Sequence, residues 1–302
     1  MIDVNKKVNL FIVGEPKCGT TALHNLLNKH PDIFMSPIKE TGYFHIKERL
    51  RKVTKLREYH DLFSDSVEKI IGESTPGYIR EKRITKKIYD YNPNAKIIIL
   101  FREPISYLKS IYRQNLEVGV EKEKNFKKAL NLEQERIEGK KIPKLPIQKN
   151  RLFHSKHVEF SKHLLNYLEV FPKEQIKVIL FEDLKNNFDL TMKSIFEFLD
   201  IDLVKIDNEK HNVSKDIKHI FLYYLIVNLN LIPFLKKIIP HKIYNTMKKI
   251  FYTKKEKISL SDHFKNKLMV KYKPEVVKLN DLLHEYNLIE KDLVEFWGYE
   301  NV

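Results

Sequence analysis

The chain has 302 residues, of which 42% are hydrophobic and 11% aromatic, as is typical of a globular protein with one large core or two smaller cores. Its single cysteine, Cys18, excludes an intramolecular disulfide, and nothing in the composition indicates an oxidising compartment. The formal net charge of +15 indicates an anionic ligand, an anionic surface or a lysine-rich solvated exterior.

Four continuous apolar runs predict strands that are covered on both faces. In chain order, these runs are Val8–Val13, Lys69–Gly72, Ile97–Phe101 and Ile176–Phe181. Helical patterns separate them, the clearest being Thr20–Lys29, Pro104–Gln114, Ser155–Val170 and Asp189–Leu199. Alternating strands and helices predict an α/β fold in which helices wrap a parallel sheet. No strand is evident after Leu203, so the last third is expected to be helical. No linker is visible, and we interpret residues 1–302 as one domain.

The run Ile220–Leu235 is the most membrane-like part of the chain. It is uncharged, yet it is short for a membrane span and is interrupted by two asparagines and a proline. Several lysines follow, so we expect residues 220–255 to form a helical, basic segment, with a buried helix followed by an amphipathic one. Contact with a membrane surface is the alternative. The N-terminal apolar run predicts a strand rather than a signal peptide, so the expected location is cytoplasmic, with a peripheral membrane contact left open.

The richest local motif is Gly14–Thr21 (GEPKCGTT), between the first predicted strand and the first predicted helix. Backbone N–H groups of such a loop point toward whatever lies before the helix, and the helix dipole favours an anion there. The two glycines allow a tight turn, the threonines add hydroxyl donors, and Lys17 supplies a positive charge. Cys18, beside Lys17 at a helix N-terminus, is expected to have an acidic, readily alkylated thiol.

A kinase or nucleotide triphosphatase is the obvious competing interpretation of this loop. Those enzymes carry lysine directly after the second glycine, whereas Thr20 occupies that position here. They also need a carboxylate near a strand end to hold magnesium, whereas the strand Ile97–Phe101 is followed by Arg102. We therefore predict an anion site without metal, and a P-loop kinase or NTPase stays as one alternative. A non-enzymatic protein that binds anionic surfaces through residues 220–249 is the other.

A second anion site is predicted around Arg102. Pro104 opens the following helix, a favoured position for proline, and Ser110 comes eight residues after Arg102. An arginine can bind a phosphate through two N–H groups, and a serine hydroxyl can complete the site. The alternative is that Arg102 pairs with a carboxylate and Ser110 faces solvent.

These motifs together resemble those of the PAPS-dependent sulfotransferases, particularly the bacterial and Golgi-type carbohydrate sulfotransferases; PAPS is 3′-phosphoadenosine 5′-phosphosulfate. The run Pro16–Thr21 is similar to the family's 5′-phosphosulfate loop, and Arg102 and Ser110 match its 3′-phosphate motif in residue type and spacing. Other similar stretches are His30–Asp32, Lys39–Phe44, Gly72–Tyr78, Phe181–Leu184 and Leu282–Trp297.

The resemblance implies a P-loop-like three-layer α/β sandwich, with a central parallel sheet flanked by helices. It implies transfer of a sulfuryl group from PAPS to a hydroxyl or amine, with PAP as product and no metal. Lys17 and Glu40 are then the expected catalytic residues. The expected donor-binding residues are Lys17, Cys18, Gly19, Thr20, Thr21, Arg102, Ser110, Asn212 and Ser214.

The resemblance makes Glu40 the expected base. The loop after the first helix returns toward the phosphate loop, so a carboxylate on it could take the proton of the attacking alcohol. Without the resemblance, a simple ion pair with Lys39 is the better interpretation. The sequence departs from the family in two places: Ser74 stands where some members carry a lysine, and Thr41 stands in place of a proline. His45 and His60 are the next candidates for a base.

The partners are less constrained by the sequence. The resemblance allows several classes of acceptor, of which a glycan, in particular an anionic glycan, is one. The fold alone does not determine which acceptor is used. No nucleic-acid-binding motif is evident, and the 12 histidines include no pair at a metal-binding spacing such as H-E-x-x-H.

Overall fold

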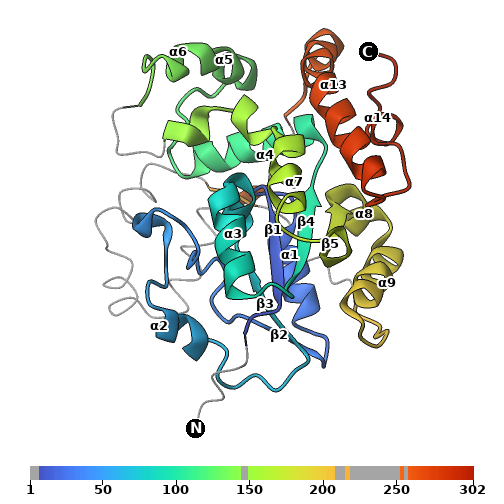
Figure 1. Ribbon diagram of the computed structural model, residues 1–302. Helices are drawn as coiled ribbons and strands as arrows, with labels where there is room; N and C mark the ends of the chain where they lie inside the picture. Colours follow the sequence, from blue (N-terminus) through green and yellow to red (C-terminus); the bar gives the residue numbers. More distant parts are fainter. Residues whose placement is uncertain (1–6, 144–148, 208–214, 218–251, 255–257) are drawn as a thin grey trace. The chain divides into compact units, whose positions relative to one another are not determined.

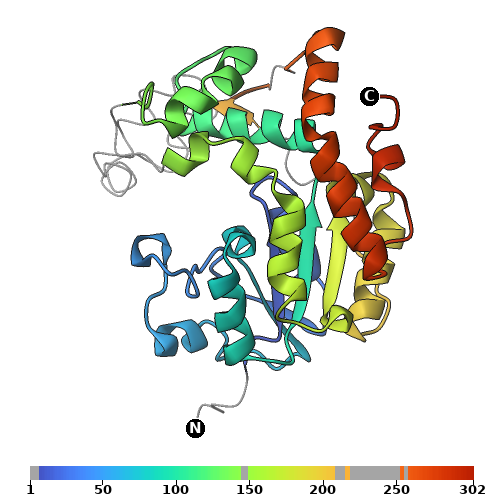
Figure 2. The ribbon, with the colours of Figure 1, turned by 45° about the horizontal axis from the view of Figure 1, so that its top comes forward.

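The computed structural model describes residues 7–143, 149–207, 215–217, 252–254 and 258–302 (Figures 1 and 2). The chain forms two compact units. The first comprises Met1–Tyr107, Val158–His211 and Asn266–Val302, and the second comprises Leu108–His157 and Asn212–Lys265. The interpretation of residues 1–302 as one domain stays a prediction. Asn212, Ser214 and most of the segment 220–255 lie outside the described residues.

A five-stranded parallel sheet forms the core of the first unit. Its strands are β1 (Leu10–Gly14), β2 (Ile33–Met35), β3 (Ile70–Ser74), β4 (Lys96–Phe101) and β5 (Ile176–Leu180). Their order is β2-β3-β1-β4-β5, and every neighbouring pair is parallel. β1 is buried along its whole length, as its continuous apolar character predicts, and β3 is buried along its whole length although it ends in Glu73 and Ser74. The predicted parallel sheet is confirmed, whereas the short strand β2 was not predicted.

Helices cover both faces of this sheet because its crossovers run in opposite directions. The chain goes from β1 outward to β2 through α1 (Thr20–Leu27) and from β3 across to β4 through α3 (Lys82–Tyr91). Since parallel crossovers are right-handed, these two helices must lie on opposite faces. Figures 1 and 2 show this arrangement, with α7 (Phe160–Leu168) beside α3. The predicted sandwich of a sheet flanked by helices is confirmed.

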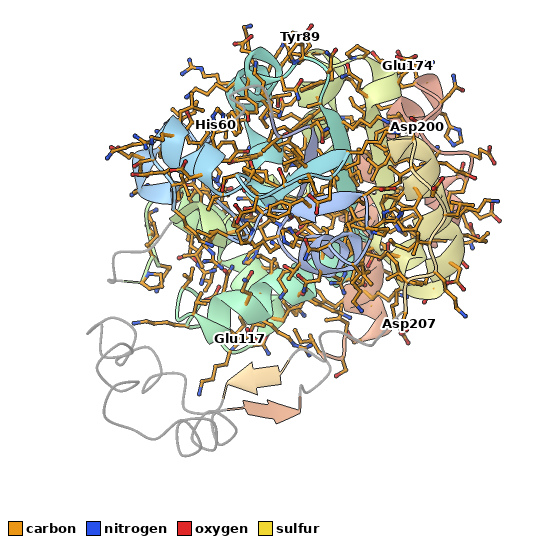
Figure 3. All side chains as sticks on the ribbon, turned by 90° about the horizontal axis from the view of Figure 1, so that it is seen from below. His60, Tyr89, Glu117, Glu174, Asp200 and Asp207 are labelled. Atoms are coloured by element: carbon orange, nitrogen blue, oxygen red, sulfur yellow. The ribbon has the colours of Figure 1, made fainter. Side chains whose placement is uncertain are left out.

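The first unit contains further helices and 3-10 turns. They are η1 (Glu48–Leu50), α2 (Leu56–Asp61), η2 (Pro76–Arg80), η5 (Lys173–Gln175), α8 (Phe181–Asn186), α9 (Phe188–Leu199) and α14 (Leu293–Phe296). Two longer helices, α4 (Pro104–Glu117) and α13 (Asp262–Glu285), contribute residues to both units. Figure 3 looks toward the edge where the strands begin; there Lys69 Nζ lies 2.8 Å from Oδ2 of Asp200, which is labelled.

The second unit contains α5 (Phe126–Asn131), α6 (Glu133–Ile137), η3 (Lys149–Leu152) and η4 (Ser155–His157), and a buried ion pair joins Arg136 to Glu121. It also contains an antiparallel pair of strands, β6 (Lys215–Ile217) and β7 (Tyr252–Lys254). The expectation that no strand follows Leu203 is therefore wrong. Within the segment 220–255, which we expect to be helical, Tyr252–Lys254 form a strand, and the rest of the segment lies outside the described residues. Each strand has only three residues, too few for an alternating apolar pattern to appear.

None of the helices in the described part of the chain is both long enough and apolar enough to span a membrane. The run Ile220–Leu235 lies outside the described residues.

Candidate anion-binding and catalytic site

The loop after β1 approaches the β4 backbone so closely that its first residue must be glycine. Gly14, the last residue of β1, has φ +147°, and a Cβ there would lie 2.6 Å from the carbonyl oxygen of Leu100. Gly19 has φ +100°, and its Cβ would lie 3.0 Å from the ring of Phe181. Both positions need the left-handed freedom of glycine. The loop lies at the edge where the parallel strands end, which is the usual ligand site of open α/β sheets.

Arg102 contacts this loop directly. Its Nη1 donates a hydrogen bond to the carbonyl oxygen of Lys17 at 3.1 Å, and its guanidinium lies 4.3 Å above the centre of the Phe181 ring. Stacking and the carbonyl together fix the orientation of the guanidinium. The two positive residues predicted from separate motifs are thus brought to one place, and the observed hydrogen-bond partner of Arg102 is a carbonyl.

Glu15 lies within the loop, and nothing in the sequence motif indicates that its carboxylate is buried. Glu15 is fully buried and accepts hydrogen bonds from Arg80 Nε at 2.8 Å and from the Tyr107 hydroxyl at 3.1 Å. Its Oε1 also lies 3.4 Å from Nδ1 of His163. Burial alone would lower the pKa of Arg80, but the charge and hydrogen bond of Glu15 and the contact with Tyr107 together outweigh burial and raise it. Arg80 therefore keeps its positive charge and offsets a negative charge on Glu15 within the loop.

Cys18 does not behave as its position in the motif predicts. Its side chain is completely buried, and burial, followed by the negative charge of Glu15, raises the pKa of the thiol well above its usual value. The expectation of an acidic, readily alkylated thiol is wrong because the side chain is buried in the core, where desolvation outweighs the nearby positive charge. Thr20 is buried and Thr21 exposed at the start of α1.

Glu40 lies on the loop that follows β2, next to the end of β3. Its N–H donates to the carbonyl oxygen of Ser74, the last residue of β3, at 3.0 Å, and its φ is +59°. The side chain is 52% exposed, and its carboxylate accepts a hydrogen bond from Nζ of Lys39 at 2.9 Å. The ion pair that the sequence offered as the simpler interpretation is thus present. It leaves about half of the Glu40 side chain open to solvent.

A second buried carboxylate, Glu73, lies beneath this loop. Its Oε2 accepts hydrogen bonds from the hydroxyls of Thr41 at 2.5 Å and Thr75 at 3.3 Å. The Tyr78 hydroxyl, nearby, accepts from the N–H of Phe44 at 3.1 Å. Burial raises the pKa of Glu73 to about 7, against the hydrogen bonds that lower it. The motif containing Glu73 is recognisable in the sequence, but its contact with the Glu40 loop depends on the pairing of distant segments.

The remaining predicted site residues are Ser110, Asn212 and Ser214 for the donor, and His45 and His60 as alternative bases. Ser110 lies half-buried on α4, in the second unit, and Asn212 and Ser214 lie outside the described residues. His45 packs against the Tyr78 ring with centroids 5.0 Å apart, and burial lowers the pKa of both His45 and His60. The structure therefore joins Lys17 to Arg102, and it separately joins the Glu40 loop to β3.

The sequence block after β5 contacts the residue that follows Arg102. Glu182 accepts from the N–H of Glu103 at 3.2 Å and from Nε1 of Trp297 at 3.3 Å. Glu103 in turn accepts from the Tyr299 hydroxyl at 2.7 Å. Residues near the end of the chain thus stabilise the start of α4 behind Arg102.

Comparison with known proteins decides the family. A model of the sulfotransferase domain matches residues 7–225. The chain belongs to the sulfotransferase family. A solved sulfotransferase from Alicyclobacillus acidocaldarius has the same fold, with a TM-score of 0.67 and 23% identity over 92% of this chain and 96% of that one. The expected P-loop-like sulfotransferase fold is confirmed.

Curated relatives of this sulfotransferase-family chain include enzymes named for carbohydrate substrates. Human carbohydrate sulfotransferase 15 is 24% identical, with 64% of this chain and 44% of the relative covered. Mouse heparan sulfate glucosamine 3-O-sulfotransferase 5 is 28% identical, with 56% of this chain and 46% of the relative covered. The chain thus spans less than half the length of these two relatives.

Proposed function

We propose that this chain transfers the sulfuryl group of PAPS to a hydroxyl or amine of a glycan acceptor and releases PAP. The observation that carries the proposal is the hydrogen bond from Arg102 to the Lys17 carbonyl, since it joins the two expected phosphate sites of one donor. The glycine loop leads directly into the N-terminus of α1, where backbone N–H groups and the helix dipole suit a phosphate group. PAPS supplies the activated sulfuryl group; the protein supplies binding, orientation and proton transfer.

The roles of the residues follow from their chemistry. The acceptor oxygen forms a bond to sulfur while the sulfur–oxygen bond to the 5′-phosphate breaks, and the electron pair goes to the departing phosphate oxygen. Lys17 stabilises the charge that develops there, and Arg102, with Ser110, binds the 3′-phosphate. Glu40 accepts the acceptor's proton. The ion pair of Glu40 with Lys39 is partly exposed, and such pairs contribute little, so it can open when an acceptor arrives.

A basic strip next to the Glu40 loop supports an anionic glycan as the acceptor. We define the strip as Lys47–Arg57, which contains six lysines and arginines and one glutamate. Its Lys52 donates through its backbone N–H to the Thr41 carbonyl at 2.8 Å and through Nζ to the Lys39 carbonyl at 2.7 Å. An acceptor with carboxylate or sulfate groups would therefore meet positive charge beside the proposed base. The names of the two mammalian relatives support a carbohydrate acceptor, and one of them names heparan sulfate.

The test measures ligand binding first and transfer second. Thermal shift should show strong stabilisation by PAP and little by ATP with magnesium. Release of PAP from PAPS should then rise when an anionic glycan, such as a desulfated heparan or chondroitin chain, is added. Stabilisation by ATP–magnesium and none by PAP would overturn the donor assignment. A response only to neutral glycans would overturn the anionic acceptor alone.

A further inference from the structure

The residue that follows the proposed base is bound to a buried carboxylate. The hydroxyl of Thr41 donates to Oε2 of Glu73 at 2.5 Å, and both side chains are fully buried. Burial therefore separates the Glu73 carboxyl group from solvent. The hydrogen bond attaches the loop that bears Glu40 to β3 through two buried side chains.

The loop needs such a restraint because its backbone is not in a relaxed conformation. Glu40 has φ +59°, in the left-handed region that L-residues adopt only at a cost. The loop is bonded to β3 and the residues that follow it. The Glu40 N–H donates to Ser74, the Thr41 hydroxyl to Glu73, and the Phe44 N–H to the Tyr78 hydroxyl. Among these contacts, the one from Thr41 to Glu73 joins two side chains, so a single substitution can remove it without altering the backbone.

The hydrogen bond between Thr41 and Glu73 has the chemistry expected of a contact that holds the loop in place. An oxygen of a carboxyl group can accept a hydrogen bond from the Thr41 hydroxyl whether the group is ionised or protonated, and burial keeps water from competing for that bond. The groups that face Glu73 are the hydroxyls of Thr41, Thr75, Tyr59 and Tyr78. Burial raises the pKa values of Tyr59 and Tyr78 well above the usual tyrosine value, so both stay neutral and neither repels the carboxylate.

We propose that Glu73 is a positioning residue, which holds the loop bearing Glu40 against the end of β3 through the Thr41 hydroxyl. The catalytic part of this inference rests on the proposed function of Glu40. The structural part does not, because it concerns the order of the loop in the protein without substrate.

Amide hydrogen exchange of Glu40 and Phe44 reports the loop directly, since both N–H groups donate hydrogen bonds to β3 and the segment after it. Thr41→Val keeps the shape of the side chain and removes the hydroxyl; exchange at both amides should rise about tenfold, the scale of one lost hydrogen bond. Thr41→Ser, which restores the hydroxyl, should return exchange close to the wild-type rate. Thr75→Val is the matched control, because Thr75 also donates to Glu73 but lies outside the loop. It should leave both amides protected.

Turnover of the same variants with the anionic glycan acceptor completes the test. Thr41→Val should lower kcat about tenfold with unchanged PAP affinity, the same scale as the loosening of the loop, and Thr41→Ser should recover it. Unchanged amide exchange in Thr41→Val, or equal loosening in Thr75→Val, would overturn the positioning role whatever the activity. If Thr41→Val loosens the loop while Glu40→Gln retains full turnover, the positioning role stands and the assignment of Glu40 as base fails.

Discussion

The indole Nε1 of Trp297 donates a hydrogen bond to Oε2 of Glu182 at 3.3 Å, across 115 residues of chain. The other oxygen of the same carboxylate accepts from the N–H of Glu103, the residue after Arg102. One carboxylate therefore connects the C-terminal segment to the start of α4.

Trp297→Phe should lower the free energy of unfolding by about 1–2 kcal/mol, because Glu182 loses a buried donor. Urea denaturation checks this, with the exposed Phe296→Leu as a control expected to change little. Equal effects of the two variants would show that the indole N–H is not the cause.

Arg102→Ala should weaken PAP binding by about 1.5–3 kcal/mol, the scale of a charge-assisted hydrogen bond, while 5′-AMP binding changes little. Arg102→Lys should recover only part of the loss, since lysine cannot bind a phosphate through two parallel N–H groups. Isothermal titration with both nucleotides measures the difference. If both ligands weaken equally, Arg102 does not bind the 3′-phosphate.

Glu40→Gln should leave PAP affinity near wild type and reduce turnover by roughly 10²–10⁴-fold, as expected for loss of a general base. The acidic limb of the pH–rate profile should disappear with the carboxylate. Lys17→Ala should differ, with both turnover and donor affinity falling. A Glu40→Gln protein with wild-type turnover and an unchanged acidic limb would transfer the role of base to another group, with His45 as the next candidate.

Cys18 should resist alkylation in the folded protein with or without PAP, because its thiol is buried and its pKa is raised. Intact-mass analysis after iodoacetamide treatment at about pH 8, where an ordinary cysteine is partly ionised, should show one adduct only after unfolding in urea. Rapid labelling of the native protein that PAP prevents would show instead that the thiol reaches the anion site.

Glu73 should make the stability of the protein depend on pH. Its pKa is raised from 4.5 to about 7 in the folded state, so the folded protein binds this proton more tightly than the unfolded chain. Its contribution to stability is then complete below about pH 4.5 and is lost as the pH rises through about 7, by roughly 3 kcal/mol. Glu73→Gln should remove this loss. Urea denaturation at about pH 5 and about pH 8 compares the two proteins, and parallel changes in both would contradict the raised pKa.

Much of the fold was predictable because β1, β4 and β5 are continuous apolar runs, and burial on both faces requires such runs. β2 escaped detection since its three residues, Ile33–Met35, are too few to show a pattern. The loop and Arg102 were predictable because each is a local motif. The pairing of Glu15 with Arg80, which lie 65 residues apart, was not, since it depends on the strand order rather than on sequence spacing. The burial of Cys18 depends on packing beneath the loop and was likewise not predictable.

The short segment Glu73–Arg80 contacts both the loop that bears Glu40 and the loop that follows β1. At one end Glu73 contacts the loop of the proposed base, and at the other Arg80 neutralises the carboxylate inside the phosphate loop. A substitution between them that shifts η2 would disturb both halves of the reaction together. A substitution that changes the acceptor preference without changing donor binding must therefore lie outside this segment, for example in the basic strip. Directed evolution toward a new acceptor should leave Glu73–Arg80 untouched and randomise Lys47–Arg57.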